Sequence, residues 1–236
     1  MAAGRYYPPS FWCGKYERPY ERRRAEVMER LYARVPFRDD WTAVDLGAGS
    51  GFYSRMLRRR AGQVIAVDVD AEAMEPLAAT GFRTVVADLD APLPLPSETA
   101  DFVNCLEVIE HLRRPLALLD EIGRLLKPRG FAVISTPNRA SLEGFKGRCA
   151  SWARGTRWTA WDDTHRTIFS YRQIVSEVRR RLEIRESGGY YYGVLSFRNH
   201  HLPPGLWRLY CRLPLLRALG FNTVLLAHKA PRAATP

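Results

Sequence analysis

Apolar and polar residues alternate along the middle of the chain in blocks that predict strands and helices in turn. Short apolar runs, typical of buried strands, are separated by stretches in which apolar residues recur every three or four positions, as on one face of a helix. The predicted strands are residues 42–46, 63–70, 84–89, 101–106, 131–136, 182–193 and 222–230. The predicted helices are residues 21–35, 53–61, 71–81, 114–130 and 170–182. This alternation indicates an α/β fold with a parallel sheet wound on both faces.

Three segments depart from the alternation. The first 40 residues join an aromatic arm to a helix, residues 138–165 are rich in loops and carry three tryptophans, and a later insertion has helical character. Since no repeat or long linker divides the chain, we predict one domain. Its predicted parts within residues 1–236 are the arm and helix (1–40), the core (41–189 and 222–230) and the insertion (190–221).

Composition sets limits on the partners and the compartment. The 236 residues are 46% hydrophobic, which suits one α/β domain with a sizeable core. The formal net charge is +11, mostly from arginine, and favours anionic partners. The arginines are dispersed over several helix patterns, which argues against a nucleic-acid surface. Because the cysteines are isolated and no signal or membrane-spanning run is present, we expect a cytoplasmic protein. Nothing in the sequence indicates an oligomeric state.

A glycine-rich turn, GAGSG, follows the first predicted strand. Gly47, Gly49 and Gly51 lack a Cβ, which lets the backbone and a helix start approach a ligand closely. Asp68 ends the next strand about 20 residues later, where an acid can accept hydrogen bonds from both ribose hydroxyls. Asp88 ends the third predicted strand at the same edge. The pattern therefore indicates a nucleoside site at the carboxyl edge of the sheet.

Four stretches together resemble the class I S-adenosylmethionine-dependent methyltransferases: VDLGAGSG, VIAVDVD, VVADLDAPLPLPSETADFVNCLEVIEHL and LLKPRGFAVISTPN. They resemble most the subset with E-x-x-E-H-L after the fourth strand and T-P-N after the fifth, which includes quinone-biosynthesis and natural-product methyltransferases. The resemblance implies a Rossmann-like, doubly wound, seven-stranded sheet, mostly parallel with a reversed last strand. It also implies an enzyme whose cofactor is S-adenosylmethionine.

The resemblance further implies which residues bind the cofactor. They are Asp45, Gly47, Gly49 and Gly51 at the methionine moiety, Asp68 and Val69 at the ribose and adenine, Asp88 and Leu89 at the adenine edge, and Leu106 beside the sulfonium.

The stretch EVIEHL sets Glu107, Glu110 and His111 on one face if it forms a helical turn. With His165 they offer the ligand types of a magnesium, manganese or zinc site, and a similar E-x-x-E-H binds metal in some quinone and small-RNA methyltransferases. In other members of the fold that need no metal, the glutamates cap the helix and the histidine points at the acceptor. We expect no metal here and predict that His111 is the catalytic base or an orienting group.

We expect methyl transfer to an oxygen or nitrogen of a small molecule, such as a secondary metabolite, quinone or sugar. The alternatives are an RNA methyltransferase, a nicotinamide-dependent oxidoreductase and a non-catalytic nucleoside-binding domain. Phe52, in place of the last glycine of a dinucleotide-binding turn, counts against the oxidoreductase. The arm and the insertion are predicted to cap the acceptor, and residues 205–219 resemble an interfacial helix that could touch a membrane surface.

Overall fold

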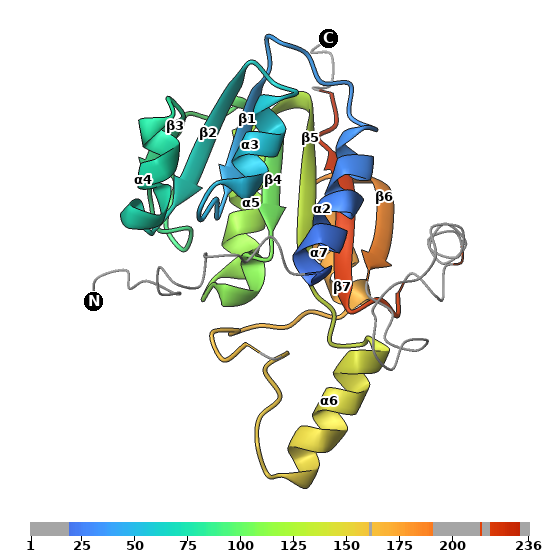
Figure 1. The fold of residues 1–236 in the computed structure, drawn as a ribbon. Coiled ribbons are helices and arrows are strands. Elements are labelled where there is room, and N and C mark those ends of the chain that lie inside the picture. The colour runs from blue at the N-terminus through green and yellow to red at the C-terminus, as the bar shows by residue number, and fades with distance from the viewer. Residues whose placement is uncertain (1–18, 161, 191–212, 214–217, 232–236) are drawn as a thin grey trace.

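The structure, a computed structural model, describes residues 19–160, 162–190, 213 and 218–231. They form a sheet of seven strands covered by helices (Figure 1). The strands are β1 (Thr42–Leu46), β2 (Gln63–Asp68), β3 (Arg83–Val86), β4 (Ala100–Leu106), β5 (Leu126–Pro137), β6 (Glu183–Tyr190) and β7 (Asn222–His228). The helices are α2 (Pro19–Tyr32), α3 (Phe52–Arg58), α4 (Ala71–Ala79), α5 (Pro115–Leu125), α6 (Leu142–Ala153), α7 (Tyr171–Arg179) and the 3-10 turn η2 (Ile109–His111).

The strand order is β3-β2-β1-β4-β5-β7-β6, so the order reverses between β1 and β4. The strands β1 to β5 pair in parallel, and β7 runs antiparallel to both of its neighbours, β5 and β6. The predicted seven-stranded, mostly parallel sheet with a reversed last strand is therefore confirmed. In open α/β sheets, such a reversal leaves a crevice for ligands at the carboxyl ends of the strands.

Successive strand residues pack against helices on opposite faces of the sheet. Ala43 and Val64 belong to a buried cluster with α2 and α3, whereas Val44 and Ile65 belong to a cluster with α5 and α7. Because both faces are covered, the central strands are continuous apolar runs, and this is why the sequence pattern located them.

Helix α6 corrects the interpretation of residues 138–165 as loops. It begins after Ser141, whose hydroxyl oxygen accepts a hydrogen bond from the N–H of Gly144 at 2.9 Å. It lies beyond the carboxyl edge of the sheet (Figure 1). Within the helix only Gly144 and Ser151 are buried, so the sequence carries no apolar stripe, and its glycines lower the helix propensity.

Two further boundaries differ from the predicted ones. Strand β3 ends at Val86, so Asp88 lies in the loop beyond the strand and not at its end. Strand β5 begins at Leu126, directly after α5 and five residues before the predicted start, because Leu126 already pairs with Ala100 of β4.

Several predictions concern residues outside the described ranges. Residues 1–18 and nearly all of the insertion are among them, so the acceptor cap and the membrane-contacting segment stay predictions, as does the single-domain assignment. In the part of the chain that the structure describes, no helix has both the length and the apolar character required to cross a membrane.

The start of α3 should tolerate no side chain at Gly51. Its φ is +79°, and a Cβ there would lie 2.3 Å from Leu77 of α4, whereas Gly81 has a φ of +80° and no atom within 4 Å of such a Cβ. We expect Gly81→Ala to lower the free energy of unfolding by about 1–2 kcal/mol through backbone strain alone. Gly51→Ala should lower it by about 1–3 kcal/mol more through overpacking. Urea unfolding measures both values, and equal losses would show that Leu77 does not restrict the turn.

Candidate active site at the carboxyl edge of the sheet

The glycine-rich turn between β1 and α3 lies across the ends of two neighbouring strands. Gly47, Gly49 and Gly51 have φ angles of 73°, 50° and 79°, in the region that favours glycine. The N–H groups of Gly47 and Ala48 donate to the carbonyl oxygen of Val67 on β2, at 2.8 and 3.1 Å. This bonding holds the turn at the edge where the sequence predicted a ligand.

Asp68, the last residue of β2, lies beside this turn. Its Oδ2 accepts a hydrogen bond from the N–H of Gly49 at 2.7 Å, and its Oδ1 accepts one from the N–H of Asp70 at 2.9 Å. Burial raises the pKa of Asp68 above its usual value, although the two N–H groups favour the ionised form. Each carboxylate oxygen retains a further lone pair, so each can accept a hydrogen bond from one ribose hydroxyl. Val69 follows and is partly buried.

Asp45 lies in a buried polar network beneath the turn and is only 2% exposed. Its oxygens accept hydrogen bonds from Ser54 Oγ at 2.6 Å and from Asn104 Nδ2 at 2.8 Å. Tyr32 donates in turn to Asn104 Oδ1 at 2.7 Å, so the network joins α2, α3, β1 and β4. Burial raises the pKa of Asp45 to about 6. Its contact with the methionine moiety stays a prediction.

The other predicted cofactor residues flank the strand-order reversal. Asp88 Oδ1 accepts a hydrogen bond from the N–H of Asp90 at 2.9 Å, in the loop after β3. Leu89 beside it and Leu106 at the end of β4 are each 8% exposed. Asp88 and Leu89 thus lie on the same side of the reversal as Asp68, and Leu106 lies on the other. Their contacts with adenine and the sulfonium stay predictions.

The segment after β4 does not form the helical turn predicted for EVIEHL. Only the three residues of η2 are helical, and Glu107 precedes them with a φ of +56°. The two glutamates therefore do not cap a helix here, as they do in other members of the fold; side chains of neighbouring strands bond to them instead. Glu107 accepts hydrogen bonds from Ser135 Oγ of β5, at 2.6 Å, and from Asn222 Nδ2 of β7.

Glu110, the middle residue of η2, is fully buried. Its Oε2 accepts a hydrogen bond from Thr136 Oγ1 of β5 at 3.0 Å. Its Oε1 is buried and has no hydrogen bond to any described residue. Burial, and next the repulsion from Glu107, raises the pKa of Glu110 well above its usual value, so a proton or another cation is favoured at this carboxylate.

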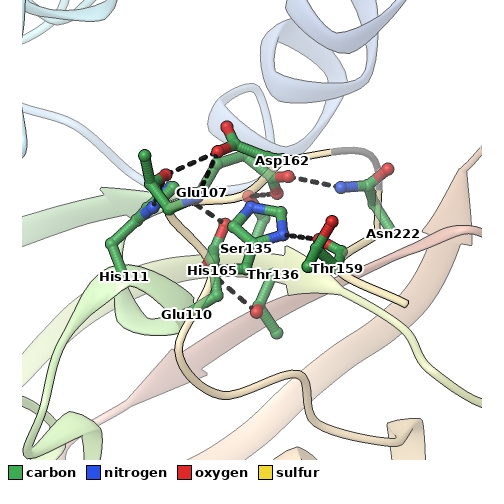
Figure 2. A network of polar contacts seen from close by, with 10 residues as sticks. Glu107, Glu110, His111, Ser135, Thr136, Thr159, Asp162, His165 and Asn222 are labelled. Atoms are coloured by element: carbon green, nitrogen blue, oxygen red, sulfur yellow. Dashed lines mark hydrogen bonds and ion pairs between the residues drawn. The ribbon is translucent and has the colours of Figure 1, made fainter. Parts of the chain in front are cut away.

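Two histidines lie next to Glu110, and each is oriented through Nδ1 (Figure 2). The hydroxyl of Thr164 donates to Asp162 at 2.6 Å, so it must accept the Nδ1–H of His111 at 2.8 Å. Nδ1 of His165 donates to the carbonyl oxygen of Thr159 at 2.7 Å. In the neutral form, both rings therefore carry their lone pair on Nε2.

Glu110, His111 and His165 each offer one ligand atom, and these atoms lie within 4.8 Å of one another. The Nε2 of His111 is 3.9 Å from Glu110 Oε1. Lone pairs that converge in this way repel unless a proton or a metal cation lies among them. The cluster can therefore accept a proton, or it can hold a divalent metal with Thr159 and Thr164 as outer partners of the kind that orient metal-binding histidines.

The sequence did not predict the residues that orient this cluster, which are Thr136, Thr159, Asp162 and Thr164. Three of them lie in the segment interpreted as loops. The run Asp-Asp-Thr directly before His165 is the available signal, because aspartate and threonine in short loops bond to nearby polar groups.

A model of a methyltransferase-domain family matches residues 20–181, which include the glycine turn, Asp68 and the Glu110 cluster. Because the match covers more than half of the 236 residues, the chain belongs to this family, the class I S-adenosylmethionine-dependent methyltransferases, whose cofactor is S-adenosylmethionine.

Two curated relatives are similar over about half of the chain. A probable S-adenosylmethionine-dependent methyltransferase of Mycobacterium tuberculosis is 36% identical over 122 residues, which are 51% of this chain and 43% of that protein. A ubiquinone biosynthesis O-methyltransferase of Xylella fastidiosa is 31% identical over 121 residues, which are 48% of each chain. The chain thus spans about half the length of the curated relatives it matches.

Among solved structures, the fold is similar to that of a methyltransferase in complex with the Trm112 methyltransferase activator of Haloferax volcanii. The TM-score is 0.65 at 22% identity, and the match covers 96% of this chain and 97% of that one. At this identity the similarity shows the fold alone.

Protonation of Asp45 should link the buried network to pH. Its pKa is about 6 in the folded chain against a usual 3.8, so the folded state binds this proton more tightly than the unfolded state. The resulting stabilisation is present below about pH 4 and is lost as the pH rises through about 6. The Asp45→Asn variant lacks this titration. We therefore expect its unfolding free energy minus that of the natural chain to rise by about 3 kcal/mol from pH 4 to pH 7. Urea unfolding across this range tests it, with the exposed Asp39→Asn as control; a difference that does not vary with pH would contradict the assignment.

Proposed function

We propose that the chain transfers the methyl group of S-adenosylmethionine to an oxygen or nitrogen of a small molecule, such as a secondary metabolite, quinone or sugar. The arrangement of the carboxyl edge carries this proposal. Asp68 ends β2 on one side of the strand-order reversal. Glu110 and His111, which follow β4, lie on the other side together with His165. One side suits a nucleoside, and the other suits a group that gives up a proton.

Bound S-adenosylmethionine supplies an electrophilic methyl group for an in-line displacement. The chain's own task is to hold the acceptor lone pair roughly 3 Å from the methyl carbon and to exclude water. In this proposal Asp68 accepts hydrogen bonds from the ribose hydroxyls, while the glycine turn and Leu106 position the methionine end.

His111 is the proposed base. Its Nε2 lone pair accepts the proton of an acceptor hydroxyl, while Nδ1–H remains bonded to Thr164, whose hydroxyl is bonded to Asp162. The Asp162 carboxylate at the end of this series favours the imidazolium that forms. An amine acceptor would need only to be neutral. The ubiquinone biosynthesis O-methyltransferase among the relatives supports an oxygen acceptor.

The buried Oε1 of Glu110 favours a metal-assisted variant of the same reaction. Glu110, His111 and His165 would hold a divalent ion, which would lower the pKa of the acceptor hydroxyl. The metal content of the protein after dialysis against manganese or zinc distinguishes the metal-assisted reaction from the one in which His111 is the base. One equivalent per chain that is lost in Glu110→Gln would favour metal, whereas a content far below one equivalent would favour His111 as the base.

The nucleoside site is tested by removal of the Asp68 carboxylate. We expect Asp68→Ala to weaken the binding of S-adenosylhomocysteine by about 1–3 kcal/mol through loss of the ribose hydrogen bonds. Isothermal titration calorimetry measures the affinity, and the exposed Asp39→Ala should leave it unchanged. An unchanged affinity of the Asp68 variant would show that the ribose lies elsewhere.

The acceptor class is tested with methyl-labelled S-adenosylmethionine. We expect the label to enter small molecules of a metabolite extract, as detected by mass spectrometry, and not added bulk RNA. His111→Ala should slow transfer to a hydroxyl by about 10²–10⁴-fold and leave the affinity for S-adenosylhomocysteine unchanged. Label found in RNA would overturn the small-molecule proposal. Loss of transfer on chelation, restored by manganese, would show that the cluster acts through a metal.

A further inference from the structure

A cavity of about 490 Å³ lies between α6 and the loop that follows it. Helix α6 lies beyond the carboxyl edge of the sheet (Figure 1), and its residues Arg148, Ser151 and Trp152 line the cavity. Its lining combines cations with aromatic rings. The arginines and tryptophans are Arg139, Arg148, Arg157, Arg166, Trp152 and Trp158.

The positive charges of this cavity are held in place but not neutralised within the described residues. The guanidinium of Arg148 lies 5.7 Å from the ring centre of Trp158 and donates to the carbonyl oxygen of Arg139. Nη2 of Arg157 donates to the carbonyl oxygen of Arg166 at 3.2 Å. None of the four arginines forms an ion pair with a described carboxylate, in contrast to Arg124 and Arg181 elsewhere in the fold.

This cavity shares a wall with the candidate active site. The N–H groups of Arg166 and Thr167 donate to the carbonyl oxygen of Glu110, at 2.8 and 3.1 Å. The adjacent His165 is buried and belongs to the Glu110 cluster. The side chain of Arg166, in contrast, is exposed and lines the cavity. A single segment of backbone, residues 165–167, therefore separates a molecule bound in the cavity from the cluster that contains the proposed base.

We propose that the cavity binds a phosphate or pyrophosphate group of the acceptor, with the tryptophans in contact with an apolar or aromatic portion of the same molecule. Guanidinium groups bind phosphate oxygens through paired hydrogen bonds, and four cations balance the several charges of a pyrophosphate better than the single charge of a carboxylate. Trp152 is 85% exposed at the rim, where its ring is open to such a contact. This inference rests on the proposed small-molecule function and specifies its substrate class.

The volume of the cavity and the grouping of its arginines favour a small ligand over RNA. The volume lies within the usual range of small-molecule sites, about 300–1,000 Å³. The four arginines line one cavity, whereas a nucleic-acid surface needs basic residues along an extended stripe.

Calorimetric titration with inorganic pyrophosphate, in buffer without divalent metal, tests the site. We expect saturable binding to the natural chain and an affinity at least about tenfold weaker in the double variant Arg157→Gln, Arg166→Gln, because charge-assisted hydrogen bonds are lost. The matched control is Arg179→Gln, an exposed arginine at the end of α7, which should bind pyrophosphate as the natural chain does. Both variants should keep the thermal unfolding midpoint and the affinity for S-adenosylhomocysteine.

No binding of pyrophosphate at millimolar concentration, or equal affinities in all variants, would overturn the proposal. The proposal would also be overturned if a short single-stranded RNA bound the natural chain more tightly than pyrophosphate does, and bound the double variant more weakly. Failure of the proposed function has a different signature: absent binding of S-adenosylhomocysteine, or methyl label in RNA, whatever the result with pyrophosphate.

Discussion

The cost of burying carboxylates at the edge of the sheet is the constraint around which the site is arranged. Asp45 and Glu110 are both removed from water, and an ionised carboxylate in such a position costs several kcal/mol unless donors surround it. The donors come from separate elements: Ser54 on α3 and Asn104 on β4 for Asp45, and Thr136 on β5 for Glu110. These donors are far apart in the sequence, so they meet the two carboxylates only in the assembled fold. The protonation states of Asp45 and Glu110 therefore depend on that fold.

The reversed strand and its surroundings belong to the same arrangement. Asn222 at the start of β7 donates to Glu107, which lies between the sheet and η2. Asn138, next to the end of β5, donates to the carbonyl oxygens of two residues before β7, and its Oδ1 accepts the N–H of Tyr171 at the start of α7. One amide side chain thus fixes the approach of three segments to the edge, and the proton-accepting side of the site depends on β7 as much as on β4 and β5.

The glycine turn and Asp68, on the side proposed for the nucleoside, could be located from the sequence because their signals are local. A glycine turn between a strand and a helix, with Asp68 at the end of the next strand, is contained in a short stretch of chain. The acceptor side could not, because its properties arise from contacts between distant segments. His165 could be grouped with Glu110 by its ligand type, but nothing near Glu110 in the sequence shows that Thr136 will donate to it. The left-handed backbone of Glu107 also breaks the helical periodicity that would have placed both glutamates on one face. The sequence pattern did not predict helix α6, because the buried residues of this helix are a glycine and a serine.

The position of β7 also has a consequence for how the chain assembles. Strand β6 is joined to the sheet only through β7, which follows it in the chain and is inserted between it and β5. During synthesis, β1 to β5 can pair as they emerge, but β6 has no place in the sheet until residues 222–228 exist. Until then β5 remains an open edge that another chain could pair with. The hydrogen bond from Asn222 to Glu107 can form only once β7 lies beside β5 and closes this edge.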